Sequence, residues 1–273
     1  MKTIRAVKKA KAVIEIGKNT SERIDNVSGA VEFLGDTFGT ACVAAVHPGS
    51  IRWKSFRYYL SLCGSQSLPI VLLLCYLMGL IIAFQAGVQM QKYGAEMIMA
   101  DMVAYSIFKE LGPLMVAIIA TGRAGSSFAA EIGTMKVDEE ISALETMGIS
   151  PNRFLVLPKL AAMVLALPML TIFGDISGVL GGATVGVYLM DIPAVTYFDR
   201  TREVLDITVF LMGLSKAVIF AVLISLSGCR KGFLAQDDAL GVGRAATGAV
   251  VSSIFLIVVA DAVLTVIFWF WGY

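Results

Sequence analysis

Two ionisable side chains interrupt long apolar stretches near the C-terminus of the sequence. Lys216 lies within the stretch 206–227, and Asp261 lies within the stretch 248–270. A charge in hydrocarbon costs at least ~2.5–3.5 kcal/mol on insertion scales, so each side chain needs a partner. The two residues lie at similar depth in their stretches, which favours an ion pair between them. Such a pair either fixes the register of two helices or takes part in ion transport.

Lys109 and Glu110 form a second charged pair, directly before Leu111-Gly112-Pro113. Adjacent residues on a helix point ~100° apart, so these two side chains cannot share one face. One of them could face a polar cavity and meet a charged lipid headgroup. Alternatively, the long side chains reach to the nearby membrane interface. The sequence leaves both interpretations open.

The segment 134–148 is rich in acids and has a narrow apolar stripe. Val137, Ile141 and Leu144 form the stripe, and charged residues cover the rest, namely Lys136, Asp138, Glu139, Glu140 and Glu145. This spacing predicts one short amphipathic helix that ends at Gly148, because Pro151 prevents its continuation. The helix either lies flat on the membrane or inserts into a cytosolic partner protein. Anionic lipid repels its acids, which favours the partner.

Four glycines recur at every fourth position, at Gly174, Gly178, Gly182 and Gly186. Four residues turn a helix by ~400°, so all four lie near one face, where another helix backbone can approach closely. The stripe could lie at a homodimer interface, beside a moving helix, or inside one subunit. The spacing does not distinguish these arrangements.

The elements that must position these residues are membrane-spanning helices. Hydrophobic residues make up 57% of the chain, and the mean hydropathy is +0.79. Runs of ~20 apolar residues span a bilayer, where the backbone must be helical or form a closed barrel. No period of two is present, so the sequence predicts an all-α polytopic fold. The five predicted spans are 68–90, 104–130, 154–190, 206–227 and 248–270, and we expect Pro158 and Pro168 to kink or divide the third.

The first part of the chain differs from the rest. Residues 1–20 are rich in lysine, an amphipathic helix is predicted from Ile24, and 51–60 interleaves basic and aromatic residues. The last pattern is better explained by a helix at the membrane interface than by nucleic-acid binding. We therefore divide the chain into 1–66, a basic arm with interfacial helices, and 67–273, the five-span domain. With five spans, most of the 22 Lys and Arg residues lie on the same side of the membrane as the N-terminus. Because Lys and Arg are enriched on the cytosolic side, this predicts a cytosolic N-terminus and an external C-terminus.

Catalytic chemistry has little support in the sequence. It has no GxxxxGK[ST] phosphate-binding loop, only one histidine, His47, and four cysteines without CxxC spacing. The sequence therefore predicts no catalytic residue, cofactor or metal site. We expect any ATP hydrolysis to take place on a separate protein.

Several motifs in order resemble the MlaE/YrbE permease family, which serves MCE-protein lipid transporters. They are Phe108–Pro113, Gly122–Ser126, Ala130–Met135, Glu139–Met147, Pro158–Pro168, Lys216, and Arg244–Thr247 with Asp261. The resemblance covers roughly residues 50–271. It implies a permease subunit of an ABC transporter in the inner membrane, with the C-terminus in the periplasm.

The resemblance also implies partners and residue roles. A homodimer would bind two copies of an ABC ATPase and a periplasmic MCE-domain protein, and would move phospholipid or a related lipid between the inner membrane and the outer envelope. Segment 134–148 would be the coupling helix that contacts the ATPase. Lys109 and Glu110 would lie at the lipid cavity, to which we also assign Gln85. A STAS-type accessory protein is left open. Two alternatives remain, an ion-coupled secondary transporter with a relay of Lys216, Asp261 and Glu110, and a non-transporting membrane scaffold.

Overall fold

The computed structural model describes residues 29, 33, 35–37, 39, 40 and 52–270. The chain divides into two compact units, Met1–Ser50 and Ile51–Tyr273. The described residues of the first unit are helical, and the Thr40 hydroxyl donates to the Asp36 carbonyl at 2.7 Å. The basic arm and most of the predicted amphipathic helix lie outside the described residues.

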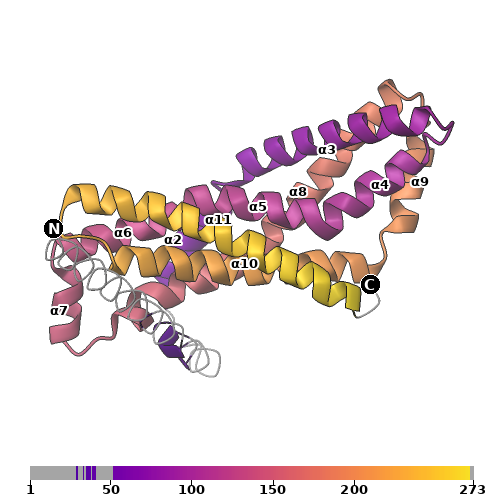
Figure 1. Cartoon of the computed structure of the whole chain (residues 1–273). Helices are drawn as coiled ribbons and strands as arrows, with labels where there is room; N and C mark the ends of the chain where they lie inside the picture. Colours follow the sequence, from indigo (N-terminus) through magenta and orange to yellow (C-terminus); the bar gives the residue numbers. More distant parts are fainter. Residues whose placement is uncertain (1–28, 30–32, 34, 38, 41–51, 271–273) are drawn as a thin grey trace, which may run out of the picture. The chain divides into compact units, whose positions relative to one another are not determined.

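Across residues 52–270 the regular elements are helices, which confirms the predicted all-α class (Figure 1). Three of them are single π-helical turns, here labelled η. The elements are α2 (Trp53–Cys63), α3 (Leu68–Gln91), α4 (Ile98–Ser106), η2 (Ile107–Leu111), α5 (Gly112–Ala120), η3 (Thr121–Gly125), α6 (Ser126–Val137), α7 (Glu140–Thr146), η4 (Asn152–Val156), α8 (Leu157–Tyr188), α9 (Ala194–Val204), α10 (Ile207–Phe233) and α11 (Ala239–Phe270).

Five helical stretches in the described part of the chain are long and apolar enough to cross a membrane. They are Trp53–Gln91, Ile98–Val137, Asn152–Tyr188, Ile207–Phe233 and Ala239–Phe270. The predicted number of spans is therefore confirmed, but all five stretches extend beyond the predicted bounds at one or both ends. Hydropathy marks only the part of a helix that suits hydrocarbon, whereas the hydrogen-bonded backbone continues into the polar interface.

Two of the π turns come directly before a proline-containing helix start. Pro113 follows η2, and Pro158 follows η4. Proline has no N–H for the carbonyl four residues earlier and its ring clashes with that carbonyl, so a wider turn relieves the conflict. Pro158 thus lies at the start of α8, but the helix continues through Pro168. Pro168 therefore does not end a helix, and the alternative expectation of a kink at this position stays a prediction.

The acidic segment 134–148 is not one helix. α6 ends at Val137, Glu139 adopts a left-handed φ of 59°, and α7 begins at Glu140. The predicted coupling helix is therefore restricted to α7, and Lys136 and Val137 belong to the end of span two. The predicted cap is present, since Gly148 has a φ of +71° just after α7. The span ends here because Asp138, Glu139 and Glu140 are three consecutive acids, which have little apolar surface to bury in a membrane.

The glycine stripe packs inside the subunit. Cβ atoms added at Gly174 or Gly178 would meet α3 and α4–α5 side chains, and those at Gly182 or Gly186 would meet Tyr197 of α9. On the facing side of α3, Cys75, Gly79, Ala83 and Gly87 also recur every four residues and are buried. Small residues on both helices let the backbones approach closely. The stripe is therefore buried by other helices of the same chain, and its role beside a moving helix stays a prediction.

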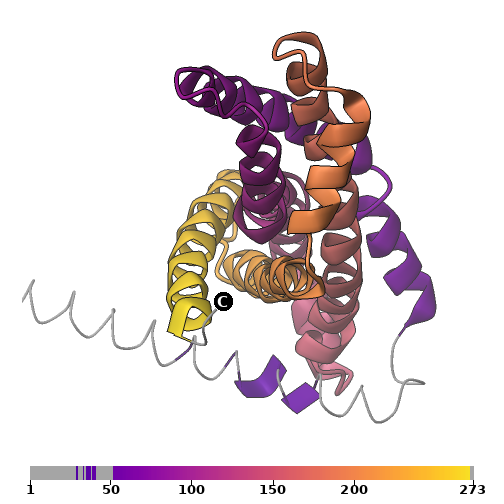
Figure 2. The same cartoon turned by 90° about the vertical axis from the view of Figure 1, so that its right-hand side faces the viewer.

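The second unit has different elements at its two ends. α7 lies at one end of the helix bundle and α9 at the other (Figure 1). α10 and α11 run side by side and antiparallel, joined by a short connection at the α7 end (Figures 1 and 2). At the α9 end, the buried Tyr197 hydroxyl donates to the Val179 carbonyl at 3.3 Å, and burial raises the pKa of its phenol.

Candidate functional site: a buried lysine between two carboxylates

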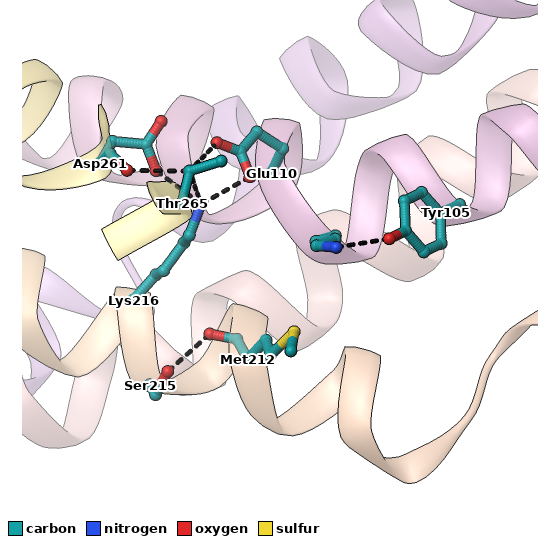
Figure 3. A network of polar contacts seen from close by, with 8 residues as sticks. Tyr105, Glu110, Met212, Ser215, Lys216, Asp261 and Thr265 are labelled. Atoms are coloured by element: carbon teal, nitrogen blue, oxygen red, sulfur yellow. Dashed lines mark hydrogen bonds and ion pairs between the residues drawn. The ribbon is translucent and has the colours of Figure 1, made fainter. Parts of the chain in front are cut away.

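Lys216 joins three spans through its ammonium group (Figure 3). Its side chain is 0% exposed, and Nζ donates to Glu110 Oε2 at 2.5 Å and to Asp261 Oδ1 at 2.9 Å. Lys216 belongs to α10, Asp261 to α11 and Glu110 to η2 in span two. The structure therefore contains the predicted ion pair between Lys216 and Asp261, and it adds Glu110 as a partner that spacing did not reveal.

Thr265 completes the cluster from one turn beyond Asp261. Its hydroxyl accepts a hydrogen bond from Lys216 Nζ at 2.9 Å. The same hydroxyl lies 2.8 Å from Glu110 Oε1 and 2.8 Å from the Asp261 carbonyl, and its single proton can be donated to only one of them. All three ammonium protons thus have an acceptor, which reduces the cost of burying the charge.

The cluster lies deep within its helices. Lys216 is nine residues after the start of α10, and Asp261 is nine residues before the end of α11. At ~1.5 Å per residue both lie ~14 Å from the same end of the helix pair, near the middle of a ~30 Å hydrocarbon layer. Of the two carboxylates, Glu110 is the more open, because its side chain is 31% exposed and that of Asp261 is 13% exposed. The site can therefore meet a ligand from the Glu110 side.

The π turn η2 positions Glu110. A π turn adds one residue to a helical turn, and such turns are frequent at functional sites. The turn ends at Gly112-Pro113, and a Cβ atom at Gly112 would collide with the Asp175 carboxyl of α8. Span two thus approaches α8 closely at the level where Glu110 faces Lys216. The Gly-Pro pair is the sequence signal for this geometry.

The other predicted lipid-cavity residues are not part of the cluster. The Lys109 ammonium donates to the Tyr105 hydroxyl and lies 4.7 Å from the centre of that ring. Gln85 is exposed on α3, and in the described part of the chain it forms no hydrogen bond with Lys109 or Glu110. The three residues do not form one contact cluster within a single chain, and their assignment to a lipid cavity stays a prediction.

A second buried lysine was missed. Lys159 of α8 has a side chain that is 0% exposed, and nothing in the sequence pattern distinguished it from the other lysines. Its Nζ lies 3.1 Å from Glu131 Oε1 of α6 and 2.9 Å from the Tyr59 hydroxyl of α2, which itself donates to Glu131 at 2.5 Å. The three residues lie 28 to 100 positions apart in the chain, so no local pattern could have identified the cluster.

The side of α7 that a partner protein could contact differs from the prediction. Ile141 and Leu144, two members of the predicted apolar stripe, are buried within the chain, at 9% and 7% exposure. Glu139, Glu140 and Glu145 are exposed. Lys136 does not face this surface, because its Nζ donates to the Ala235 carbonyl at 2.7 Å, in the connection between α10 and α11. A partner of α7 would therefore meet its acidic side.

Comparisons with known proteins show the family of the chain. A family model described as Permease MlaE matches residues 56–267. A probable ABC transporter permease protein of Rickettsia bellii is 36% identical over 231 residues, which cover 85% of this chain and 89% of the relative. A probable ABC transporter permease protein of Synechocystis is 30% identical over 217 residues, covering 80% of this chain and 82% of the relative.

A third relative has a more specific name. The intermembrane phospholipid transport system permease protein MlaE of Haemophilus influenzae is 33% identical over 205 residues, which cover 75% of this chain and 78% of the relative. The family match spans most of the second unit, including the Lys216 cluster and α7. The chain therefore belongs to the MlaE permease family and is an ABC transporter permease.

Proposed function

We propose that this chain moves phospholipid across or out of the inner membrane as the permease subunit of an ABC transporter, and that a separate ATPase drives it through α7. Family membership supports the transporter class, and the name of the Haemophilus relative supports phospholipid as the substrate. The observation that carries the coupling role is the exposed acidic side of α7, whose apolar side is already buried in its own chain.

α7 is suited to transmit motion to the candidate site. It follows α6 after a break of only two residues, Asp138 and Glu139. α6, η3, α5, η2 and α4 form one continuous helical stretch, Ile98–Val137, in which Glu110 lies on η2. A displacement of α7 would be carried along this stretch, and the π turns η3 and η2 are places where it could bend.

The lipid path follows from the same stretch. The Glu110 side chain is about one-third exposed, and Lys109 is the adjacent residue on the helix. The charged headgroup of a lipid would therefore contact these two side chains at this depth in the membrane. The complete transporter would contain two copies of this chain, two ATPase subunits and an MCE-domain protein at the periplasmic end, which we assign to α9. A STAS-type accessory protein is a further candidate partner.

Charge reversal on α7 tests this proposal. We expect the variant Glu140→Lys with Glu145→Lys to lose co-purification with the ATPase and about tenfold or more of ATP-dependent lipid transfer, because several surface charge pairs are replaced by repulsion. Transfer of a fluorescent phospholipid out of vesicles that contain the full complex measures the activity. Asp199→Lys, a charge reversal at an exposed acid on α9, far from α7 along the chain, is the control for ATPase binding and should retain co-purification with the ATPase.

Two outcomes would contradict the proposal. One is unchanged ATPase binding and transfer in the α7 variant. The other is lipid transfer by the purified chain in vesicles without nucleotide, because the chain would then need no separate ATPase.

A further inference from the structure

A groove lies between the α2–α3 turn and the first half of α8, on elements that do not carry the Lys216 cluster. Its volume is about 390 Å³, within the ~300–1,000 Å³ range of small-molecule pockets. Leu60, Gly64 and Leu68 line one wall. Ala166, Met169 and Phe173 line the other. Glu110, Lys216 and Asp261 are not among the lining residues, so this is a separate site.

Small residues create the groove. Gly64 lies between α2 and α3, where an added Cβ atom would approach the Leu60 carbonyl to 2.8 Å and the Ala166 Cβ atom to 3.9 Å. Ala166 is the small residue of α8 opposite this turn. A larger side chain at Ala166 would therefore occupy the space.

The groove has a mainly apolar surface, and a few polar residues are among those that line it. Arg57, Ser61 and Ser65 lie on the α2 side. Arg57 is exposed, and the structure shows no ion pair for it with any other described residue. The Ser61 and Ser65 hydroxyls lie 3.2 Å apart. On the α8 side, Met169 and Phe173 are 53% and 50% exposed.

The surroundings of the groove indicate its occupant. Both walls belong to helical stretches that are apolar and long enough to cross a membrane, Trp53–Gln91 and Asn152–Tyr188. The apolar surface of the groove therefore faces acyl chains rather than water. A guanidinium next to such a groove matches a molecule with a phosphate at one end and a hydrocarbon chain at the other.

We propose that this groove binds one phospholipid from the surrounding membrane. Its phosphate contacts Arg57, with Ser61 and Ser65 as further donors, and one acyl chain lies between the α2–α3 turn and α8. Lipid binding in this groove requires neither the ATPase nor transport. The proposal therefore goes beyond the function proposed above, and an experiment can reject it without rejecting that function.

Photolabelling tests the site. The full chain is reconstituted in vesicles of phosphatidylethanolamine and phosphatidylglycerol. A photoreactive probe is added to the vesicles, either phosphatidylglycerol or diacylglycerol, and both probes carry the same diazirine-bearing acyl chain. Mass spectrometry then maps the labelled peptides. We expect labelling by phosphatidylglycerol to concentrate on residues 60–68 and 165–173.

Two variants define the contacts. Arg57→Gln should lower labelling by phosphatidylglycerol about tenfold, the change expected for losing one charged phosphate contact, and should leave labelling by diacylglycerol unchanged. Lys54→Gln, at an exposed base on the same helix that does not line the groove, is the control and should change neither. Ala166→Leu should lower labelling by both lipids because it fills the groove, and circular dichroism checks that this variant is folded.

Other results would overturn the proposal. Equal labelling in the Arg57→Gln and Lys54→Gln variants would exclude the phosphate contact. Labelling spread evenly over all spans would exclude a specific site. Cross-links that place residues 1–50 or a second copy of the chain in the groove, with no lipid label there, would show that a protein segment occupies it.

Discussion

Lys216 shares its one positive charge between two carboxylates, Glu110 and Asp261, and the hydroxyl of Thr265. The net gain from a buried ion pair is often small, because desolvation offsets the attraction. Removal of one partner is different, because the remaining charges are then buried without compensation. The cluster is therefore expected to fix how η2, α10 and α11 pack, whatever its part in transport.

Neutral substitutions at the cluster test this role. Lys216→Met should lower the free energy of unfolding by about 3–5 kcal/mol, because two carboxylates then face each other without a cation. The triple variant Lys216→Met, Glu110→Gln, Asp261→Asn should recover most of the loss. Denaturation of the full chain in detergent, followed by circular dichroism, measures both.

Lys109→Met is the matched control for this series, because the Lys109 ammonium contacts the Tyr105 ring and hydroxyl and forms no ion pair with another described residue. We expect it to change stability by less than ~1 kcal/mol. If the triple variant were as unstable as Lys216→Met, the charge-compensation argument would be wrong.

At the scale of elements, α3 and α8 make the most extensive contact between any two described helices. Gly79 faces the Gly178 backbone, and Gly181 faces the Tyr76 backbone, so each helix has a glycine against the other. Because backbone atoms cannot move aside as a flexible side chain can, this contact tolerates no added atom without a shift of the helices.

Gly79→Ala should therefore separate α3 from α8 and destabilise the chain by about 1–3 kcal/mol. Gly122→Ala is the comparison, since an added Cβ atom there meets no other atom of the chain within 4 Å. That variant should be neutral or gain up to ~1 kcal/mol through lower backbone entropy in the unfolded state. Thermal melting of the two variants in detergent gives the difference, and equal melting temperatures would contradict the packing argument.

At the scale of the whole molecule, the five spans place α7 and α9 at opposite ends of the bundle. The distribution of Lys and Arg predicts that the α7 end is cytosolic. This orientation is needed for the proposed function, because an ATPase must reach α7 and an MCE-domain protein must reach the other end.

Cysteine labelling tests the orientation. In a Cys42→Ser background, a membrane-impermeant maleimide should label Asp199→Cys in intact spheroplasts. It should label Ser142→Cys only after the membrane is made permeable. The remaining native thiols, Cys63, Cys75 and Cys229, are buried and set the background. The opposite pattern would reverse the orientation, and labelling of both positions from outside would contradict the odd number of spans.

Much of the fold was predictable because it depends on local properties of the chain. A run of apolar residues in a membrane must be helical wherever it is, so the five spans, their order and the cap at Gly148 followed from the sequence. The partnership of Lys216 with Asp261 also followed, because depth in a span can be counted along a helix. The family motifs, such as Phe108–Pro113 and Gly122–Ser126, depend on sequence alone and identified the transporter class.

Only the tertiary structure decided which side of each helix is covered by other helices, because the covering helices lie far away in the sequence. It added Glu110 to Lys216, buried Lys159 against Tyr59 and Glu131, and directed the four-glycine stripe toward α3 and α9. It also buried Ile141 and Leu144 and left the acids of α7 exposed. Periodicity shows that a helix has an apolar side, but what covers that side is determined by the packing of the other spans.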